Sequence, residues 1–109
     1  MSATVHSVNS KPHKEDILWL ETTLRFSNCW LHADELLVAR GDAVDFAGKR
    51  WIRAVASESE WIISGNDGYK HVAHATDEEI THFVNRMKSQ IDVMTVRIEA
   101  VQRNKASLN

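Results

Sequence analysis

The chain has 109 residues, a formal net charge of −2, a hydrophobic share of 43% and a charged share of 26%. This length fits one domain with one core, and these proportions exclude a wholly disordered chain and a membrane protein. The weak negative charge excludes a global positive field toward phosphate backbones, so any contact with DNA must rest on local charge.

The N-terminal stretch, residues 1–14, is polar, contains Pro12 and lacks hydrophobic periodicity, which predicts a flexible arm. The same stretch lacks the apolar segment of a signal peptide, and the one cysteine, Cys29, has no disulfide partner within the chain. We therefore expect a cytoplasmic protein. Because Cys29 stands in a short apolar run that ends at Leu31, we also expect its thiol to be buried and unreactive.

Three helices are predicted before residue 58. Apolar residues at helical spacing predict the first helix over 15–26, and the extended run 29–31 follows it. The second is predicted over 33–40, with Gly41 as its C-terminal stop. The third, over 46–57, carries apolar side chains on one side and basic side chains on the other. These helices and the segment up to residue 75 make one predicted domain, 15–75.

A hairpin is predicted after the third helix. Two strand-like runs, which lie within 61–72, flank the turn residues 64–68. Thr76 and Glu79 then have the spacing of a capping box, which predicts the start of a fourth helix. The fold class predicted from these elements is mainly α with a small β-hairpin and a long C-terminal helix.

The fourth helix is predicted over 76–104, with 105–109 as a tail. Apolar residues recur along it with alternating spacings of four and three, the heptad pattern of a coiled coil, at Ile80, Val84, Met87, Ile91, Met94, Ile98 and Val101. Three short helices offer little surface to cover so long a stripe, so we expect it to form a homodimer through Ile91, Met94, Ile98 and Val101. Packing of the whole stripe inside one chain is the alternative, and the pattern leaves parallel and antiparallel pairing open.

The order of helix, short strand, helix, turn, basic helix and hairpin resembles a winged helix-turn-helix. Several segments are similar to the N-terminal winged-helix domain of biotin-repressor-type regulators: Trp30–Leu36, Gly41, Lys49–Val55, Ile62–Ser64 and the wing end Gly68-Tyr69. The similarity covers about residues 17–72. Small phage proteins with a winged helix followed by a long helix have a similar layout.

The resemblance implies a non-enzymatic, dimeric DNA-binding protein that acts as a transcriptional regulator or phage DNA-transaction factor. It places Lys49, Arg50 and Arg53 on a recognition helix in the major groove of double-stranded DNA. It places Asn66 and Lys70 on a wing near the backbone or minor groove. The alternative is a protein-interaction adaptor or inhibitor, which uses the same scaffold without DNA and binds another protein.

The chain departs from the family pattern at several positions. Asp42 and Asp45 bring negative charge to the place where phosphates would pass. Gly48 stands where an apolar residue is expected, so the third helix is predicted to start late, near Ala47. His32 stands where a serine would cap the second helix, so we expect a weaker cap there.

The sequence carries no recognisable catalytic or metal-binding motif. It contains no glycine-rich phosphate loop and no nucleophile elbow. His71, His74 and His82 are the closest histidines, but they fall on different predicted elements and have no cysteine nearby. We therefore expect no catalytic residues, no metal, no cofactor and no membrane association.

Overall fold

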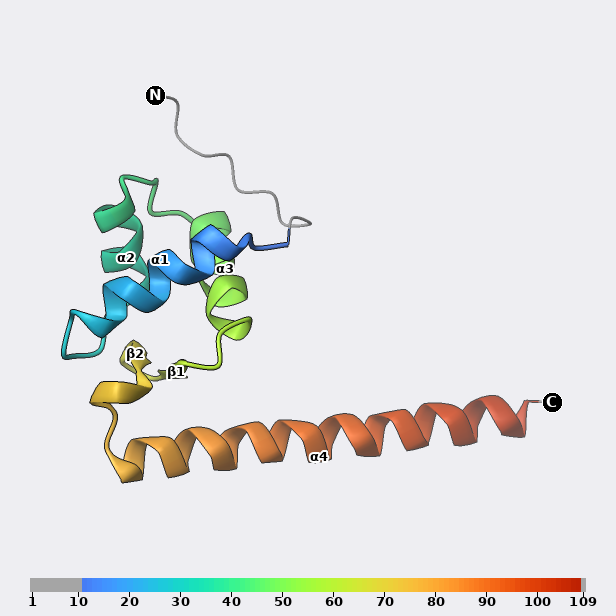
Figure 1. Ribbon diagram of the computed structural model, residues 1–109. Coiled ribbons are helices and arrows are strands. Elements are labelled where there is room, and N and C mark those ends of the chain that lie inside the picture. Colours follow the sequence, from blue (N-terminus) through green and yellow to red (C-terminus); the bar gives the residue numbers. More distant parts are fainter. Residues whose placement is uncertain (1–10, 109) are drawn as a thin grey trace. The chain divides into compact units, whose positions relative to one another are not determined.

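A computed structural model describes residues 11–108 (Figure 1). It is mainly helical, with one two-stranded hairpin and a long C-terminal helix, so the predicted fold class is confirmed. The chain divides into two compact units at Thr76. We call residues 11–76 the head; the second unit contains the long helix. Most of the predicted arm, residues 1–10, lies outside the described residues.

Three helices build the head: α1 (Lys14–Arg25), α2 (Ala33–Arg40) and α3 (Phe46–Ser57). The predicted ranges 33–40 and 46–57 are confirmed for α2 and α3, and the late start of the third helix near Ala47 is wrong. The first helix begins at Lys14, which the sequence assigned to the arm, and it ends at Arg25. It starts early because the backbone N–H of His13 donates to the Asp16 carboxylate at 3.1 Å, which closes the first turn.

The core of the head consists of aliphatic side chains from all three helices. Those with no exposed surface are Leu20, Leu24, Leu36, Leu37, Ile52 and Val55. Ile62 and Ile63 from the hairpin are also buried. Each helix of the head contributes only one apolar face. The core side chains of one helix are therefore buried only when the other two helices pack against it.

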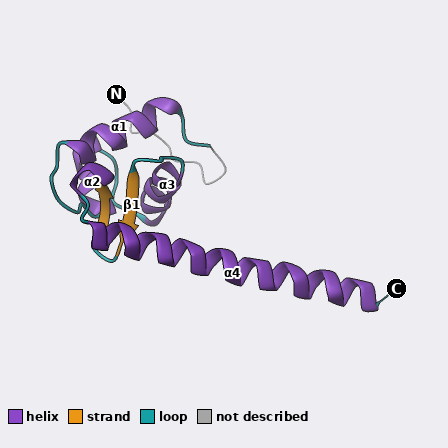
Figure 2. Ribbon diagram, turned by 60° about the horizontal axis from the view of Figure 1, so that its bottom comes forward, coloured by secondary structure: helices purple, strands orange, loops and turns teal. Residues whose placement is uncertain are grey.

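The hairpin pairs β1 (Ile62–Gly65) with β2 (Gly68–His71) in antiparallel register (Figure 2). A short 3-10 helix, η1 (Val72–His74), follows. The predicted extended run before α2 also pairs with the hairpin. The Leu31 N–H donates to the Tyr69 carbonyl at 2.9 Å, and the Tyr69 N–H donates to the Leu31 carbonyl at 2.8 Å.

Gly68 makes the pairing of Leu31 with Tyr69 possible. Its φ is +114°, a conformation that L side chains rarely adopt. A Cβ atom at this position would lie 2.2 Å from the Leu31 carbonyl oxygen. The glycine of the Gly-Tyr pair is therefore required by the close approach of the Leu31 backbone as well as by the turn.

Arg40 joins the three helices of the head through its guanidinium. The group lies over the rings of Trp19 (4.9 Å) and Trp51 (4.4 Å). Its nitrogens also lie 3.1 Å from carboxylate oxygens of Asp16 and Asp42. The cation is thus held by two aromatic faces and two acids, a cluster that sequence reasoning did not find.

The long helix, α4 (Asp77–Ser107), has 31 residues, or about 46 Å at about 1.5 Å per residue. It begins at Asp77, one residue after the predicted start. It runs past residue 104, so residues 105–107 are helical rather than part of a tail; no glycine or proline stops the helix there. None of residues 77–107 is buried. Among residues 11–108, no helix combines the length and apolarity needed to cross a membrane.

Candidate nucleic-acid interface

The exposed side of α3 is a stripe of mostly basic side chains. The helix buries Gly48, Ile52, Val55 and Ala56 toward the core. The opposite side, which we call the α3 stripe, consists of Phe46, Lys49, Arg50, Arg53 and Ser57. Their spacing of three or four residues places them on one face. The three cations that the sequence predicted on the recognition helix therefore share one exposed surface.

The start of α3 is capped well, contrary to the late start expected from Gly48. Asp45 Oδ1 accepts a hydrogen bond from the Gly48 N–H at 2.7 Å, so the helix begins at Phe46. A Cβ on Gly48 would lie 3.0 Å from both the Ala43 carbonyl oxygen and Leu37 Cδ1. The glycine lets the turn after α2 pack closely against α3.

The start of α2 is also capped, although His32 stands where a serine was expected. The His32 backbone N–H donates to Glu35 Oε1 at 3.1 Å. This bond supplies the carboxylate half of a capping box, which the expectation of a weak cap overlooked.

Each cation of the α3 stripe has a neighbour within the head. Lys49 Nζ lies 3.3 Å from Asp34 Oδ1, and both side chains are about half exposed. The Arg50 guanidinium stacks on the Phe46 ring at 4.6 Å. Arg53 donates a hydrogen bond to the Tyr69 hydroxyl. Burial raises the pKa of Tyr69 above its ordinary value, while the charge and hydrogen bond of Arg53 act in the opposite direction.

The hairpin presents fewer basic groups than the sequence predicted. Asn66 is exposed at the hairpin turn, next to the exposed acid Asp67. Lys70 is only 9% exposed, and its ammonium lies 5.3 Å from the centre of the Trp30 ring. Lys70 pairs in register with the buried Ile63, and strand alternation places both side chains on the face opposite the one that Ile62 and Tyr69 turn toward the core. Asn66 is therefore exposed, as the residues of the α3 stripe are, whereas Lys70 is buried.

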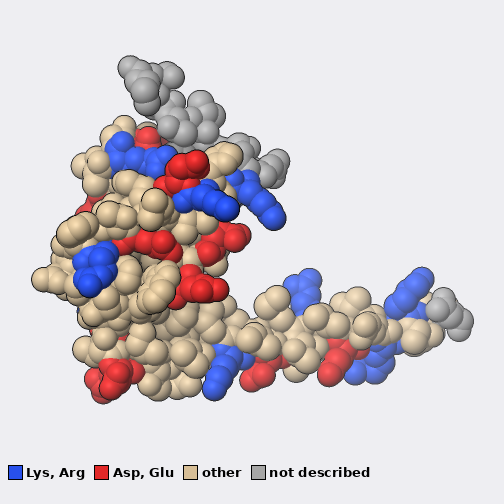
Figure 3. All heavy atoms as spheres, viewed as in Figure 1, with Lys and Arg blue, Asp and Glu red and all other residues tan. Residues whose placement is uncertain are grey.

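Charges of both signs are interspersed on the face of the head drawn in Figure 3. Asp34 lies beside the α3 stripe through its ion pair with Lys49. Asp42 is held by Arg40, and Asp45 is used as the cap of α3. The positive charge of this interface is therefore limited to the stripe itself.

The predicted dimerisation residues are all exposed on α4. The exposed fractions are 60% for Ile91, 63% for Met94, 56% for Ile98 and 58% for Val101. At a spacing of three and four residues they form one apolar face, which we call the seam. The seam is the second candidate surface of the molecule.

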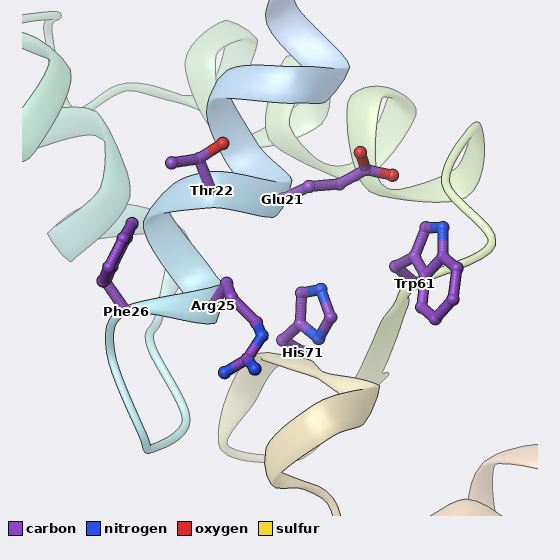
Figure 4. Close-up of a pocket in the computed structure, with 6 residues that line it drawn as sticks. All are labelled: Glu21, Thr22, Arg25, Phe26, Trp61 and His71. Atoms are coloured by element: carbon purple, nitrogen blue, oxygen red, sulfur yellow. The ribbon is translucent and has the colours of Figure 1, made fainter.

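A hollow of about 400 Å³ lies between the end of α1 and the hairpin. Its lining consists of Glu21, Thr22, Arg25, Phe26, Trp61 and His71, with Phe26 and Trp61 on opposite sides (Figure 4). The sequence did not indicate this hollow, because its residues come from three separated segments.

His71 is the buried titratable group of this region. It is 8% exposed and stacks on the Trp61 ring at 6.0 Å between ring centres. Its Nδ1 accepts from the Ala73 N–H at 3.0 Å. Burial lowers the pKa of His71, and the charges of Arg25 and His74 lower it further; Glu21 acts in the opposite direction.

Two further sequence expectations concern cysteine and histidine. Cys29 is exposed rather than buried, because the chain passes over the surface before it reaches the sheet at Leu31. The rings of His71 and His74 lie 6.4 Å apart. Within the described part of the chain, no three histidine, cysteine, aspartate or glutamate side chains gather in a way that would hold a metal ion.

Comparisons with protein families, with curated proteins and with solved structures find no match to this chain.

Proposed function

We propose that the protein is a non-enzymatic, dimeric DNA-binding protein, a transcriptional regulator or phage DNA-transaction factor that acts by occupying its site. We infer that the head is a winged helix-turn-helix. Three features support this inference: α2 and α3 joined by a tight turn, the hairpin after α3, and the pairing of Leu31 with Tyr69. The lone cysteine supports a cytoplasmic location.

The observation that carries the proposal is the α3 stripe. Lys49, Arg50 and Arg53 project from one exposed face of a helix whose opposite face is buried. An α-helix fits the major groove of duplex DNA. Arginine matches the acceptors of guanine in that groove, and lysine binds the phosphates along its edges. In this proposal, the exposed Asn66 at the hairpin turn also contacts DNA.

A second copy of the chain is the proposed partner of the seam. The exposed seam residues recur at heptad spacing, a pattern that is self-complementary when two such helices pair. Pairing two heads through α4 would set the distance between two half-sites on DNA.

Salt-dependent binding to duplex DNA tests this function. The full-length protein should bind duplex DNA, and its affinity should fall steeply as salt rises, because phosphate contacts release counterions. R50E/R53E should remove this binding. The matched control, K11E/K14E, makes the same change in net charge outside α3 and should retain most of the DNA binding. No binding to random or selected duplexes at low salt would overturn the proposal.

Light scattering tests the dimer. The wild-type protein should have the mass of two chains, and I91D/I98D should have the mass of one, because aspartate cannot be buried at the seam. The control V93D changes an exposed apolar residue of α4 outside the seam and should remain dimeric. A monomeric wild-type protein would contradict this part of the proposal.

The acids around the α3 stripe favour a second candidate function. Asp34 pairs with Lys49, and Asp67 is exposed beside Asn66. In this alternative the head is an adaptor or inhibitor that binds another protein and no DNA. Failure of DNA binding, together with retained dimerisation, would favour it.

A further inference from the structure

Phe46 and Arg50 form a stacked pair within the α3 stripe. Phe46 is the first residue of α3 and is 73% exposed. The guanidinium of Arg50, one helical turn later, lies 4.6 Å from the centre of its ring. A large exposed apolar ring at this place sits among the cations proposed to contact DNA, rather than in the core.

The stacking leaves both groups able to recognise bases. A guanidinium stacks through its planar face, while its N–H groups point outward in that plane. Those groups match O6 and N7 of guanine in the major groove. The ring of Phe46 can contact the C5-methyl group of thymine, the apolar group that the major groove presents.

The spacing of the pair matches neighbouring bases. Four residues separate the two positions by about 6 Å along the helix, and the stacking at 4.6 Å draws their end groups closer. Stacked bases of one strand are about 3.4 Å apart. We propose that Phe46 and Arg50 together read adjacent thymine and guanine bases, Phe46 through the thymine methyl group and Arg50 through guanine O6 and N7. This inference rests on the proposed DNA-binding function.

Replacement of thymine by uracil tests the role of Phe46. The duplex with the highest affinity is selected from a random library and then made again with uracil at each thymine, which removes only the methyl groups. The wild-type protein should bind the thymine duplex about fourfold more tightly for each methyl group that it contacts. In F46A this ratio should fall to about one, with the affinity for the uracil duplex changed less than about twofold.

F26A is the matched control, because Phe26 is 85% exposed in the head but lies outside the α3 stripe. It should keep the wild-type ratio. Replacement of single guanines by 7-deazaguanine, which lacks N7, should weaken wild-type binding about tenfold at one position and leave R50A unaffected there.

The outcomes separate this inference from the function on which it rests. If wild-type protein binds both duplexes equally, with steep salt dependence, the pair does not read thymine and the DNA-binding proposal stands. A thymine preference that persists in F46A also overturns the inference. If neither duplex is bound at low salt, the proposed function fails and the inference fails with it.

Discussion

The head and α4 differ in where their apolar side chains lie. In the head, three helices of 8 to 12 residues have fully buried leucine, isoleucine and valine side chains. In α4, none of residues 77–107 is buried, and the seam is more than half exposed. Helices as short as those of the head are marginal in isolation, so packing within the chain must stabilise them. The apolar face of α4 has no such cover.

The difference predicts two separate unfolding transitions. All four tryptophans lie in the head, so tryptophan fluorescence reports the head, whereas the far-ultraviolet circular dichroism signal includes the long helix. The fluorescence transition should not depend on protein concentration. The transition of α4 should depend on it if a second copy covers the seam.

The largest effect is expected from the core. L24A removes most of a fully buried side chain and should lower the free energy of unfolding of the head by about 2–5 kcal/mol. I98A, in the seam, should leave the fluorescence transition within about 0.5 kcal/mol and should weaken only the concentration-dependent transition. Denaturant titrations followed by tryptophan fluorescence and by circular dichroism measure both effects. Equal effects of the two variants on fluorescence would mean that head and helix unfold as one unit.

A smaller effect, still within the head, is expected at the hairpin. G68A places a Cβ against the Leu31 backbone and should cost about 3 kcal/mol, since both the strained φ and the collision must be relieved. The control is G41A: Gly41 has a φ of +83°, but a Cβ added there would meet no neighbouring atom within 4 Å, so strain alone should cost about 1 kcal/mol. Thermal unfolding followed by fluorescence compares the two. Equal losses would show that the contact with Leu31 is unimportant.

The Arg40 cluster should contribute less. R40K keeps the charge but loses the planar group that lies between Trp19 and Trp51, and should cost about 1 kcal/mol. R97K makes the same change on α4 and should have no measurable effect on the head. Denaturation curves followed by fluorescence test both variants. An unchanged midpoint for R40K would argue that the stacking adds little beyond the charge.

The smallest effect is a pH dependence confined to the head. Burial lowers the pKa of His71 below its ordinary value of 6.5, so below this pH the unfolded chain binds a proton that the folded head does not. The stability of the head should therefore fall as the pH drops through 6.5, and this loss should end below the folded-state pKa.

H71N should reduce this pH dependence, because asparagine keeps an acceptor for the Ala73 N–H and does not titrate. H82N, on α4, is the control and should behave as the wild type. Fluorescence-detected stability is compared at about pH 7.5 and about pH 5.5. A wild-type pH slope in H71N would assign the effect to other groups.

Local pattern was enough to predict the four α-helices and the hairpin, although not η1 or the limits of α1 and α4. The apolar spacing of Leu20 and Leu24 in α1, the run of Ile62 and Ile63 in β1 and the heptads of α4 each depend on residues close in the chain. The three cations of the α3 stripe were found in the same way, because residues three or four apart on one helix share a face. These features follow from the geometry of helix and strand alone.

Tertiary structure decided which polar groups are available. Lys70 is buried beside the Trp30 ring, which comes from a distant segment, and Arg40 lies between two rings that come from different helices. Cys29 is exposed because the segment before Leu31 meets the sheet only at that residue. Each of these outcomes depends on contacts between segments distant in sequence, which the spacing of neighbouring residues does not encode.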